Sequence, residues 1–215
     1  MSDATVGGAP ASSARDRAIW NALFGDVPPD WRTASPSRAM VDCRDFFVGA
    51  GARSVLDLGC GVGRWAVYLA KAGFEVSGSD FAENGLRYAA GWAADEGVSV
   101  RLVCRPITEM PFPGERFDAV VAALVLDNVT RGEMAFGIDV MRRSLRPDGV
   151  AFCLFNPLVT CDSAADGTDN PTAGVTRVVY DDAELRAAFA EFSVIDTREY
   201  EMRTRGFFLR RCGPA

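Results

Sequence analysis

The fold of this chain is decided by the stretch Ser54-Val-Leu-Asp-Leu-Gly-Cys-Gly-Val-Gly-Arg-Trp-Ala-Val-Tyr-Leu-Ala-Lys71, an apolar run that breaks into a glycine-rich turn and continues with helical spacing. Residues 55–58 predict a short strand with Asp57 near its carboxyl end. The backbone then turns sharply, and can approach a ligand where a Cβ would collide, at Gly59, Gly61 and Gly63. Apolar residues at 65, 66, 69 and 70 restore a period of 3.6, so a helix N-terminus points at whatever lies over the loop.

The spacing of these glycines distinguishes two kinds of nucleotide-binding loop. The dinucleotide-binding fingerprint needs glycine at its first, third and sixth places, and the sixth place here is Arg64. The pattern Asp57-x-Gly59-x-Gly61-x-Gly63 resembles instead motif I of the class I S-adenosylmethionine-dependent methyltransferases. That resemblance implies an acidic residue at the end of the next strand, about 20 residues further on, to hold ribose hydroxyls. Asp80, followed by Phe81, stands at this place.

Length and composition predict one globular domain without a membrane span. The chain has 215 residues, of which 48% are hydrophobic, and no apolar run is long enough to cross a bilayer. The first residues lack the charged and then apolar order of a signal peptide, so we expect a cytoplasmic protein. Six cysteines are widely spaced without a Cys-x-x-Cys pair, which predicts buried free thiols.

Charge and the lack of histidine restrict the chemistry. A net charge of −6 argues against a surface that follows phosphates, so we expect neither a nucleic acid nor a membrane as partner. The chain has no histidine, which removes the commonest zinc ligand and the usual general base near neutral pH. We therefore predict no metal site, and proton transfer must fall to a carboxylate, a tyrosine, a cysteine, a lysine or water.

The N-terminal part predicts a tail and two helices. Residues 1–14 are rich in alanine, serine and glycine without period and predict a disordered tail. Residues 15–50 predict a helix over 15–24 and a second one that begins at Ser35-Pro36, with serine as N-cap. In the resembled family such pieces lie across the cleft, which makes Trp20, Trp31 and Arg38 candidates for a helical lid and the two tryptophans candidates for substrate contact. Aromatic residues on an amphipathic helix also serve simply as core packing, and both interpretations stay open.

Residues 51–215 predict the methyltransferase domain itself. Strands over 74–79, 98–104, 117–126 and 150–155 alternate with helices over 82–96 and 132–145. This rhythm indicates parallel βαβ units whose ligands lie beyond the carboxyl ends of the strands. Residues 156–178 predict a polar loop that is either mobile or a cover for the site, and 181–189 predict a short helix capped by Asp181 or Asp182.

Two final strands, over 192–200 and 206–210, are too close in sequence for a crossover helix and must form an antiparallel hairpin. An antiparallel final strand inserted into a parallel sheet is typical of the class I methyltransferase fold. The resemblance therefore covers about residues 50–211. The predicted fold is a doubly wound, Rossmann-like α/β domain with a seven-stranded sheet, mostly parallel, that contains this antiparallel C-terminal hairpin strand.

The resemblance also implies a cofactor, S-adenosyl-L-methionine, and roles for single residues. Its methionine end would lie on the loop formed by Gly59, Cys60, Gly61 and Gly63, with Asp57 ordering the loop or engaging the amino group. Asp80 would take the ribose hydroxyls and Phe81 would pack on the adenine. The family's adenine-binding aspartate position is Pro106 here, which leaves the backbone N–H of Ile107 as a substitute.

The predicted fourth strand ends in Leu124-Val-Leu-Asp127-Asn128, where relatives often carry a residue that faces the transferring methyl group. We expect Leu124 at the cofactor, and Asp127 either as the substrate-facing carboxylate that accepts a proton or as the cap of the next helix. Asn128 and Asn156 are further substrate candidates. Asn156-Pro157 lacks the second proline and the aromatic residue of the nucleic-acid N-methyltransferase motif and follows the wrong strand.

These patterns predict transfer of a methyl group from S-adenosyl-L-methionine to a small-molecule acceptor by in-line displacement, driven mainly by proximity and orientation. Two alternatives remain. The chain could bind the cofactor or a partner without catalysis, as the changes at Pro106 and Asp127 would allow. A nicotinamide-dependent oxidoreductase fits less well, because of Arg64 and the terminal hairpin. The acceptor and the oligomeric state leave no trace in the motifs.

Overall fold

The computed structural model describes residues 14–25, 30–156 and 175–213, without the side chains of Asp30 and Trp31. Nearly all of the predicted tail and residues 157–174 of the predicted loop lie outside this part of the chain. The helices are α1 (Ala14–Leu23), α2 (Asp30–Thr33), α3 (Arg38–Gly49), α4 (Arg64–Lys71), α5 (Glu83–Asp95), α6 (Arg131–Ser144), α7 (Asp182–Ala188) and the 3₁₀ turn η2 (Glu201–Arg203). The strands are β1 (Ser54–Leu58), β2 (Glu75–Asp80), β3 (Val100–Cys104), β4 (Phe117–Ala123), β5 (Leu145–Phe155), β6 (Phe192–Glu199) and β7 (Arg205–Arg211).

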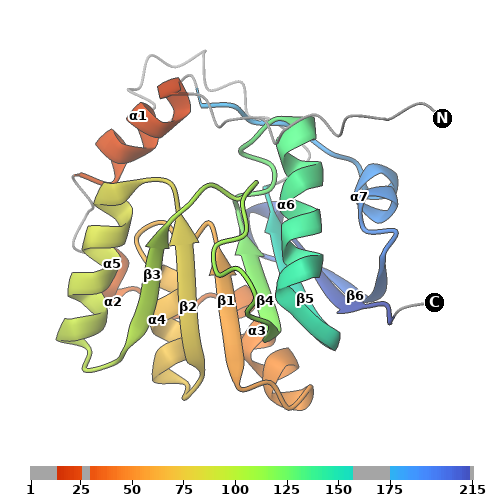
Figure 1. Cartoon of the computed structure of the whole chain (residues 1–215), viewed down its shortest axis with the longest axis horizontal. Helices are drawn as coiled ribbons and strands as arrows, with labels where there is room; N and C mark the ends of the chain where they lie inside the picture. Colours follow the sequence, from red (N-terminus) through yellow and green to blue (C-terminus); the bar gives the residue numbers. More distant parts are fainter. Residues whose placement is uncertain (1–13, 26–29, 157–174, 214–215) are drawn as a thin grey trace.

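One seven-stranded sheet runs through the molecule in the order β3-β2-β1-β4-β5-β7-β6 (Figure 1). The first five strands in this order pair in parallel. β7 is antiparallel to both of its neighbours, β5 and β6. The predicted seven-stranded sheet with an antiparallel C-terminal hairpin strand is therefore confirmed.

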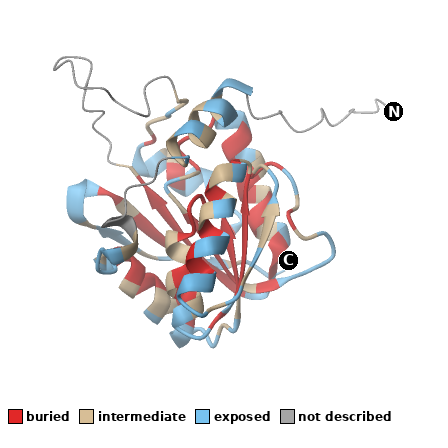
Figure 2. Cartoon of the chain, turned by 90° about the vertical axis from the view of Figure 1, so that its left-hand side faces the viewer, coloured by how far each residue is buried: buried red, intermediate tan, exposed pale blue. Residues whose placement is uncertain are grey.

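Both faces of the central strands are buried, which explains their continuous apolar runs. In β5, Ala151, Cys153 and Phe155 belong to the core under α6 and α7, whereas Val150, Phe152 and Leu154 belong to the core under α3 and α4. Figure 2 shows the buried strands between helices whose outer faces are exposed. The sheet is thus a rigid platform, and its carboxyl edge is free to carry a site.

Several element ends differ from their predicted positions. α3 begins two residues later than expected, because Ser37 rather than Ser35 is the N-cap and its Oγ accepts a hydrogen bond from the Met40 N–H. α7 is capped by Asp181, which forms a capping box with Glu184. β4 ends at Ala123, three residues before the predicted end, because Leu124 adopts a left-handed backbone with φ of 56°.

The cysteines of the described chain are free, as predicted, and Cys161 lies outside it. Cys43, Cys60 and Cys153 are buried as expected, but Cys104, at the end of the edge strand β3, and Cys212, after the last residue of β7, are exposed. Among the described residues, no helix combines the length and apolar character needed to cross a membrane.

Candidate functional site

A cavity of about 350 Å³ opens at the carboxyl ends of β1, β2 and β4, where parallel-sheet proteins place their ligands. Its floor is the glycine-rich loop after β1. Its walls come from α1, α3, the start of α4 and the turn between β6 and β7. Of the residues expected at the cofactor or substrate, the cavity brings together Trp20, Asp57, Gly59, Cys60, Gly61, Asp80, Phe81, Leu124 and Asn128.

The loop glycines have different reasons for lacking a side chain. Gly59 has φ of +75°, and a Cβ there would lie 2.3 Å from Cγ2 of Val125, a distance that no packing allows. Gly61 has φ of +51° and faces the ring of Phe24, 3.1 Å from the place of a Cβ. A Cβ on Gly63 would collide with Ala89, so this glycine lets α4 pack on α5 and does not line the cavity. Gly63 thus has a packing role, and its contact with a cofactor stays a prediction.

Asp57 lies at the cavity floor with an unsatisfied carboxylate. The residue is 2% exposed, and its Oδ2 has no hydrogen-bond partner within the described part of the chain. Burial, together with the negative charge of nearby Asp80, raises the pKa of the Asp57 carboxyl to about 8. A buried, unpaired acceptor of this kind is costly unless a ligand completes it, so it marks a place for a donor group, above all a cation.

Asp80 holds the loop in its conformation. Its Oδ2 accepts a hydrogen bond from the N–H of Gly61 at 2.8 Å, and its Oδ1 accepts one from the N–H of Ala82 at 2.8 Å. Burial raises its pKa, and these backbone hydrogen bonds offset part of that rise. Each oxygen keeps a lone pair, so Asp80 can still accept hydrogen bonds from a diol that enters the cavity.

The helix α1 covers the glycine loop and the Asp80 end of the cavity. The rings of Trp20 and Phe24 lie 5.3 Å apart, and both line the cavity. The Arg17 guanidinium lies 5.7 Å from the centroid of the Phe81 ring, on the surface where an adenine was expected to pack. α1 is docked on α5 by two hydrogen bonds, from the N–H and the Nδ2 of Asn84 to Asn21.

The expected adenine contacts at Pro106 and Ile107 do not line this cavity. Ile107 is 2% exposed and packs into the core against α6, where its Cδ1 lies 3.0 Å from the place of a Cβ on Gly137. The side chain therefore serves the core.

Asp127 does not face the cavity, which corrects the expectation that it faces a substrate. The left-handed turn at Leu124 directs the chain away from the sheet edge, and Asp127 becomes 3% exposed. Its Oδ2 accepts a hydrogen bond from the N–H of Asn156 at 2.7 Å, and its carbonyl accepts one from the N–H of Val178 at 2.8 Å. Burial raises its pKa, against these hydrogen bonds from Asn156. It is not a cap either, since Thr130 caps α6. Asp127 therefore ties the ends of β4 and β5 together.

The two asparagines that were expected at the substrate, Asn128 and Asn156, both lie close to Asp127. Asn156 lies beside Asp127 in a separate small cavity and not in the main one. Asn128 lines the main cavity, where its Nδ2 donates to the Leu124 carbonyl at 2.6 Å and so supports the strained turn. The side chain of Trp31 lies outside the described residues.

Sequence reasoning missed a second group of cavity residues, which come from four segments of the chain. They are Met40 from α3, Trp65 from α4, Leu154 from β5, and Tyr200, Glu201, Met202 and Thr204 from the β6–β7 turn. Their apolar character reads as core packing in a sequence pattern. One local signal exists: the short connection between the two final strands has no glycine at positions 202 and 203, where the structure has a positive φ.

Comparison with known proteins assigns the central part of the chain. Residues 55–149 match the family model described as a methyltransferase domain. Over these residues the chain is similar to methyltransferase domains. The match covers the strands β1 to β4 and includes the glycine-rich loop at the cavity floor and Asp80. The match supports the predicted resemblance over this part of the chain.

Two curated relatives match this methyltransferase domain. The ubiquinone biosynthesis O-methyltransferase of Methylobacterium sp. (strain 4-46) is 35% identical over 99 residues, which are 46% of this chain and 39% of that protein. The demethylmenaquinone methyltransferase of Staphylococcus aureus (strain JH9) is 35% identical over 114 residues, 52% of this chain and 46% of that protein. The matched part thus spans less than half the length of these curated relatives.

Among solved structures, magnesium protoporphyrin IX methyltransferase from Synechocystis PCC 6803 with bound SAM has the same fold. The TM-score is 0.69 at 18% identity, over 94% of this chain and all (100%) of that one. At this identity the likeness is one of fold. It extends beyond the family-model match to the N-terminal helices and the C-terminal hairpin.

Proposed function

We propose that this chain transfers a methyl group from S-adenosyl-L-methionine to a small-molecule acceptor. The observation that carries the proposal is the unpaired, buried Oδ2 of Asp57 at the floor of a cavity beside a glycine-rich loop. The methyltransferase domain match, the relatives named as methyltransferases and the solved neighbour with bound SAM support the same conclusion. The net charge of −6 supports a small acceptor rather than a nucleic acid.

The residues of the cavity fit this cofactor chemically. The ammonium group of its methionine part would complete the unpaired oxygen of Asp57, and the ribose diol would use the remaining lone pairs of Asp80. The positive φ of Gly59 and Gly61 shapes the loop, and Val125 and Phe24 fill the places that their side chains would take. Phe81, which lines the cavity, would lie against the adenine once Arg17 moves from its ring.

When bound, the cofactor supplies an activated methyl group on a sulfonium, and its sulfur is the leaving group. The protein has to hold the acceptor in line and keep water out. Orientation of this kind can lower a barrier by up to about 7–11 kcal/mol. Trp20 and Phe24 of the α1 cover and Leu124 at the end of β4 are the residues that exclude water from the cavity. A chain without histidine can therefore catalyse this reaction.

Calorimetric titration of the purified protein with S-adenosylhomocysteine, with NAD as control, tests the proposal. We expect micromolar binding of S-adenosylhomocysteine alone. A panel of phenolic, quinol and amine acceptors with radiolabelled S-adenosyl-L-methionine then tests transfer. Binding of NAD instead, or tight cofactor binding with no transfer to any acceptor, would contradict the proposal.

A further inference from the structure

The cavity has a second end, away from the carboxylates of Asp57 and Asp80. This end lies between α3 and the β6–β7 turn and is lined by Met40, Trp65, Leu154, Tyr200 and Met202. Its surface is largely apolar. Apart from Asp57 and Asp80, the charged side chains that line this cavity are the half-buried Arg64 at the start of α4 and the exposed Glu201. The buried carboxylate of α3, Asp42, is already engaged by Arg38, Arg198 and Tyr200. A cation would lose its hydration here without gaining a buried counter-charge.

Two residues at this cavity have strained backbones and exposed apolar side chains. Leu124 has φ of 56° and is 39% exposed, and Met202 has φ of 54° and is 85% exposed. A left-handed backbone costs free energy for any residue with a side chain, and it persists where the surrounding structure enforces it. The two residues belong to segments far apart in the chain and line the same cavity. Exposed leucine and methionine side chains beside one cavity gain contacts when an apolar ligand fills it.

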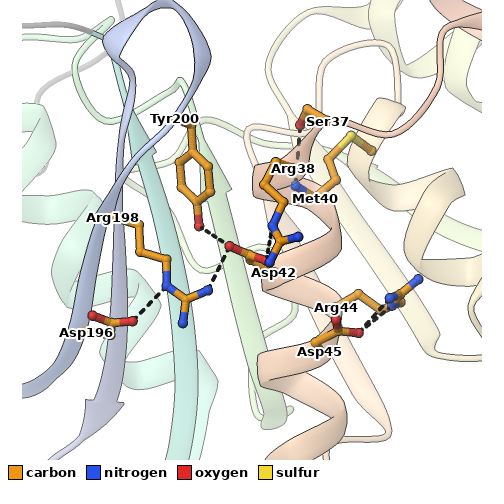
Figure 3. Close-up of polar contacts among 9 residues, drawn as sticks. All are labelled: Ser37, Arg38, Met40, Asp42, Arg44, Asp45, Asp196, Arg198 and Tyr200. Carbon is orange, nitrogen blue, oxygen red and sulfur yellow. Dashed lines mark hydrogen bonds and ion pairs between the residues drawn. The ribbon is translucent and has the colours of Figure 1, made fainter.

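The two walls of this end are joined by one buried carboxylate (Figure 3). Asp42 of α3 is 6% exposed. Its Oδ2 accepts hydrogen bonds from Arg198 Nη1 at 2.8 Å and from the Tyr200 hydroxyl at 3.2 Å, and its Oδ1 pairs with Arg38 Nε at 2.7 Å. Tyr200 thus lines the cavity with its ring and holds α3 with its hydroxyl. Gly206 leaves the room for that ring, because a Cβ there would lie 2.7 Å from it.

We propose that the end of the cavity between α3 and the β6–β7 turn binds the methyl acceptor as an uncharged, apolar molecule, with Met202 and Leu124 as specificity-determining residues and Asp42 as the positioning residue that holds both walls. This proposal rests on the proposed function. It states which acceptors the protein takes and names residues outside the methyltransferase-domain match, which ends at residue 149.

The first test is binding of the uncharged fluorophore N-phenyl-1-naphthylamine to the full chain saturated with S-adenosylhomocysteine. We expect enhanced, blue-shifted emission and a dissociation constant that Met202→Glu raises at least tenfold. The matched control is Ile195→Glu, which places the same charge at another exposed apolar residue of the hairpin, outside the cavity; it should leave the constant unchanged. No binding to the wild type, displacement of the fluorophore by S-adenosylhomocysteine, or equal effects of both variants would overturn the proposal.

The second test concerns Asp42. Asp42→Asn should weaken binding of the same fluorophore about tenfold while the affinity for S-adenosylhomocysteine stays within twofold of the wild type. Asp45→Asn, on the same helix but paired only locally with Arg44, is the control and should change neither. If Asp42→Asn weakens both ligands equally, or neither, Asp42 is not a positioning residue of the acceptor end.

These measurements separate the two proposals. Fluorophore binding without binding of S-adenosylhomocysteine refutes the proposed function and leaves the apolar end in place. Binding of S-adenosylhomocysteine without the fluorophore refutes the inference alone.

Discussion

Helices α1 and α3 both line the cavity, but they are attached to the molecule in opposite ways. None of the ten residues of α1 is buried, and the helix is attached by polar contacts, two hydrogen bonds between Asn84 and Asn21 and two from Thr176 to the Asp16 carboxylate. α3 buries five of its residues, among them Phe47 in the core and Asp42 in its ion-paired site. The predicted lid of residues 15–50 is therefore not one unit. We propose that α1 opens for the cofactor, whereas α3 is a fixed wall.

The largest expected effect is on the free energy of unfolding, and it tests whether α3 is part of the hydrophobic core. Phe47 is fully buried, so Phe47→Ala should lower the free energy of unfolding by about 3–5 kcal/mol. Urea denaturation measures this loss. Val48→Ala, at the neighbouring residue with a 60% exposed side chain, is the control and should change stability by less than about 0.5 kcal/mol. Equal effects of the two variants would break the distinction between the helices.

The second largest effect is expected from a substitution at the cavity floor, on the affinity for S-adenosylhomocysteine. Asp57→Asn removes the carboxylate that we assign to the ammonium group of the cofactor. The binding free energy of S-adenosylhomocysteine should become less favourable by about 1.5–3 kcal/mol. Since the pKa of Asp57 is about 8 in the empty protein, binding at pH 7 must release a proton. The wild-type affinity should thus fall as the pH falls below about 8, and that of Asp57→Asn should not.

The same pKa fixes the sign of a stability change. Between about pH 4 and pH 8 the folded protein holds a proton on Asp57 that the unfolded chain has lost, so stability contributed by this proton decreases as the pH rises through that window. Asp57→Asn should remove this slope. Calorimetry in buffers of different ionisation enthalpy counts the released proton, and urea denaturation at several pH values measures the slope. A wild-type affinity that is constant between pH 6 and 8 would contradict the assignment.

A smaller effect sharpens the role of α1 as a cover. Phe24, directly after α1, lies over Gly61, so Phe24→Ala should speed dissociation of S-adenosylhomocysteine about three- to tenfold, or by about 0.7–1.4 kcal/mol. Stopped-flow fluorescence measures this rate. The free energy of unfolding should hardly change. A loss of stability as large as that of Phe47→Ala would show that α1 belongs to the core.

The smallest effect is local to the docking of α1. Asn21→Ala removes the side-chain Oδ1 that accepts the hydrogen bond from the Asn84 N–H, while the bond from Asn84 Nδ2 to the backbone carbonyl of residue 21 stays, and it should lower the free energy of opening of α1 by about 0.5–1 kcal/mol. Hydrogen exchange of the α1 amides measures this opening. Arg15→Ala, at an exposed residue of the same helix, should leave exchange unchanged. Faster exchange throughout the sheet would instead indicate global destabilisation.

The two ends of the cavity differ in how far they can be predicted from sequence. The loop from Asp57 to Gly63 and the following Asp80 are set by local spacing and backbone freedom, so the pattern alone places them on a strand end and a turn. The order of strands and helices and the final hairpin follow from periodicity and connection length in the same way. Even here the role of Gly63 differs, because its contact with α5 is tertiary.

The acceptor end has no such local signal. Asp42 and Arg198, which join its walls, are 156 positions apart in the chain. Asp127 was misplaced for a related reason, since a leucine at position 124 gives no hint of a left-handed backbone that ends β4 early. Polarity in the sequence therefore pointed to Asp127, whereas burial and long-range pairing select Asp42 and the apolar residues around it.

The place of β7 in the sheet has a consequence for folding. β7 is the last strand of the described chain, yet it fills the gap between β5 and β6 and buries Phe207, Phe208 and Leu209. Until it arrives, β5 is an open edge that can pair with another chain. During synthesis, which proceeds from the N-terminus, the sheet thus stays incomplete after every other strand has been made. Exposure of this edge makes a chain cut before Arg205 prone to aggregation through β5, although its cavity floor would be complete.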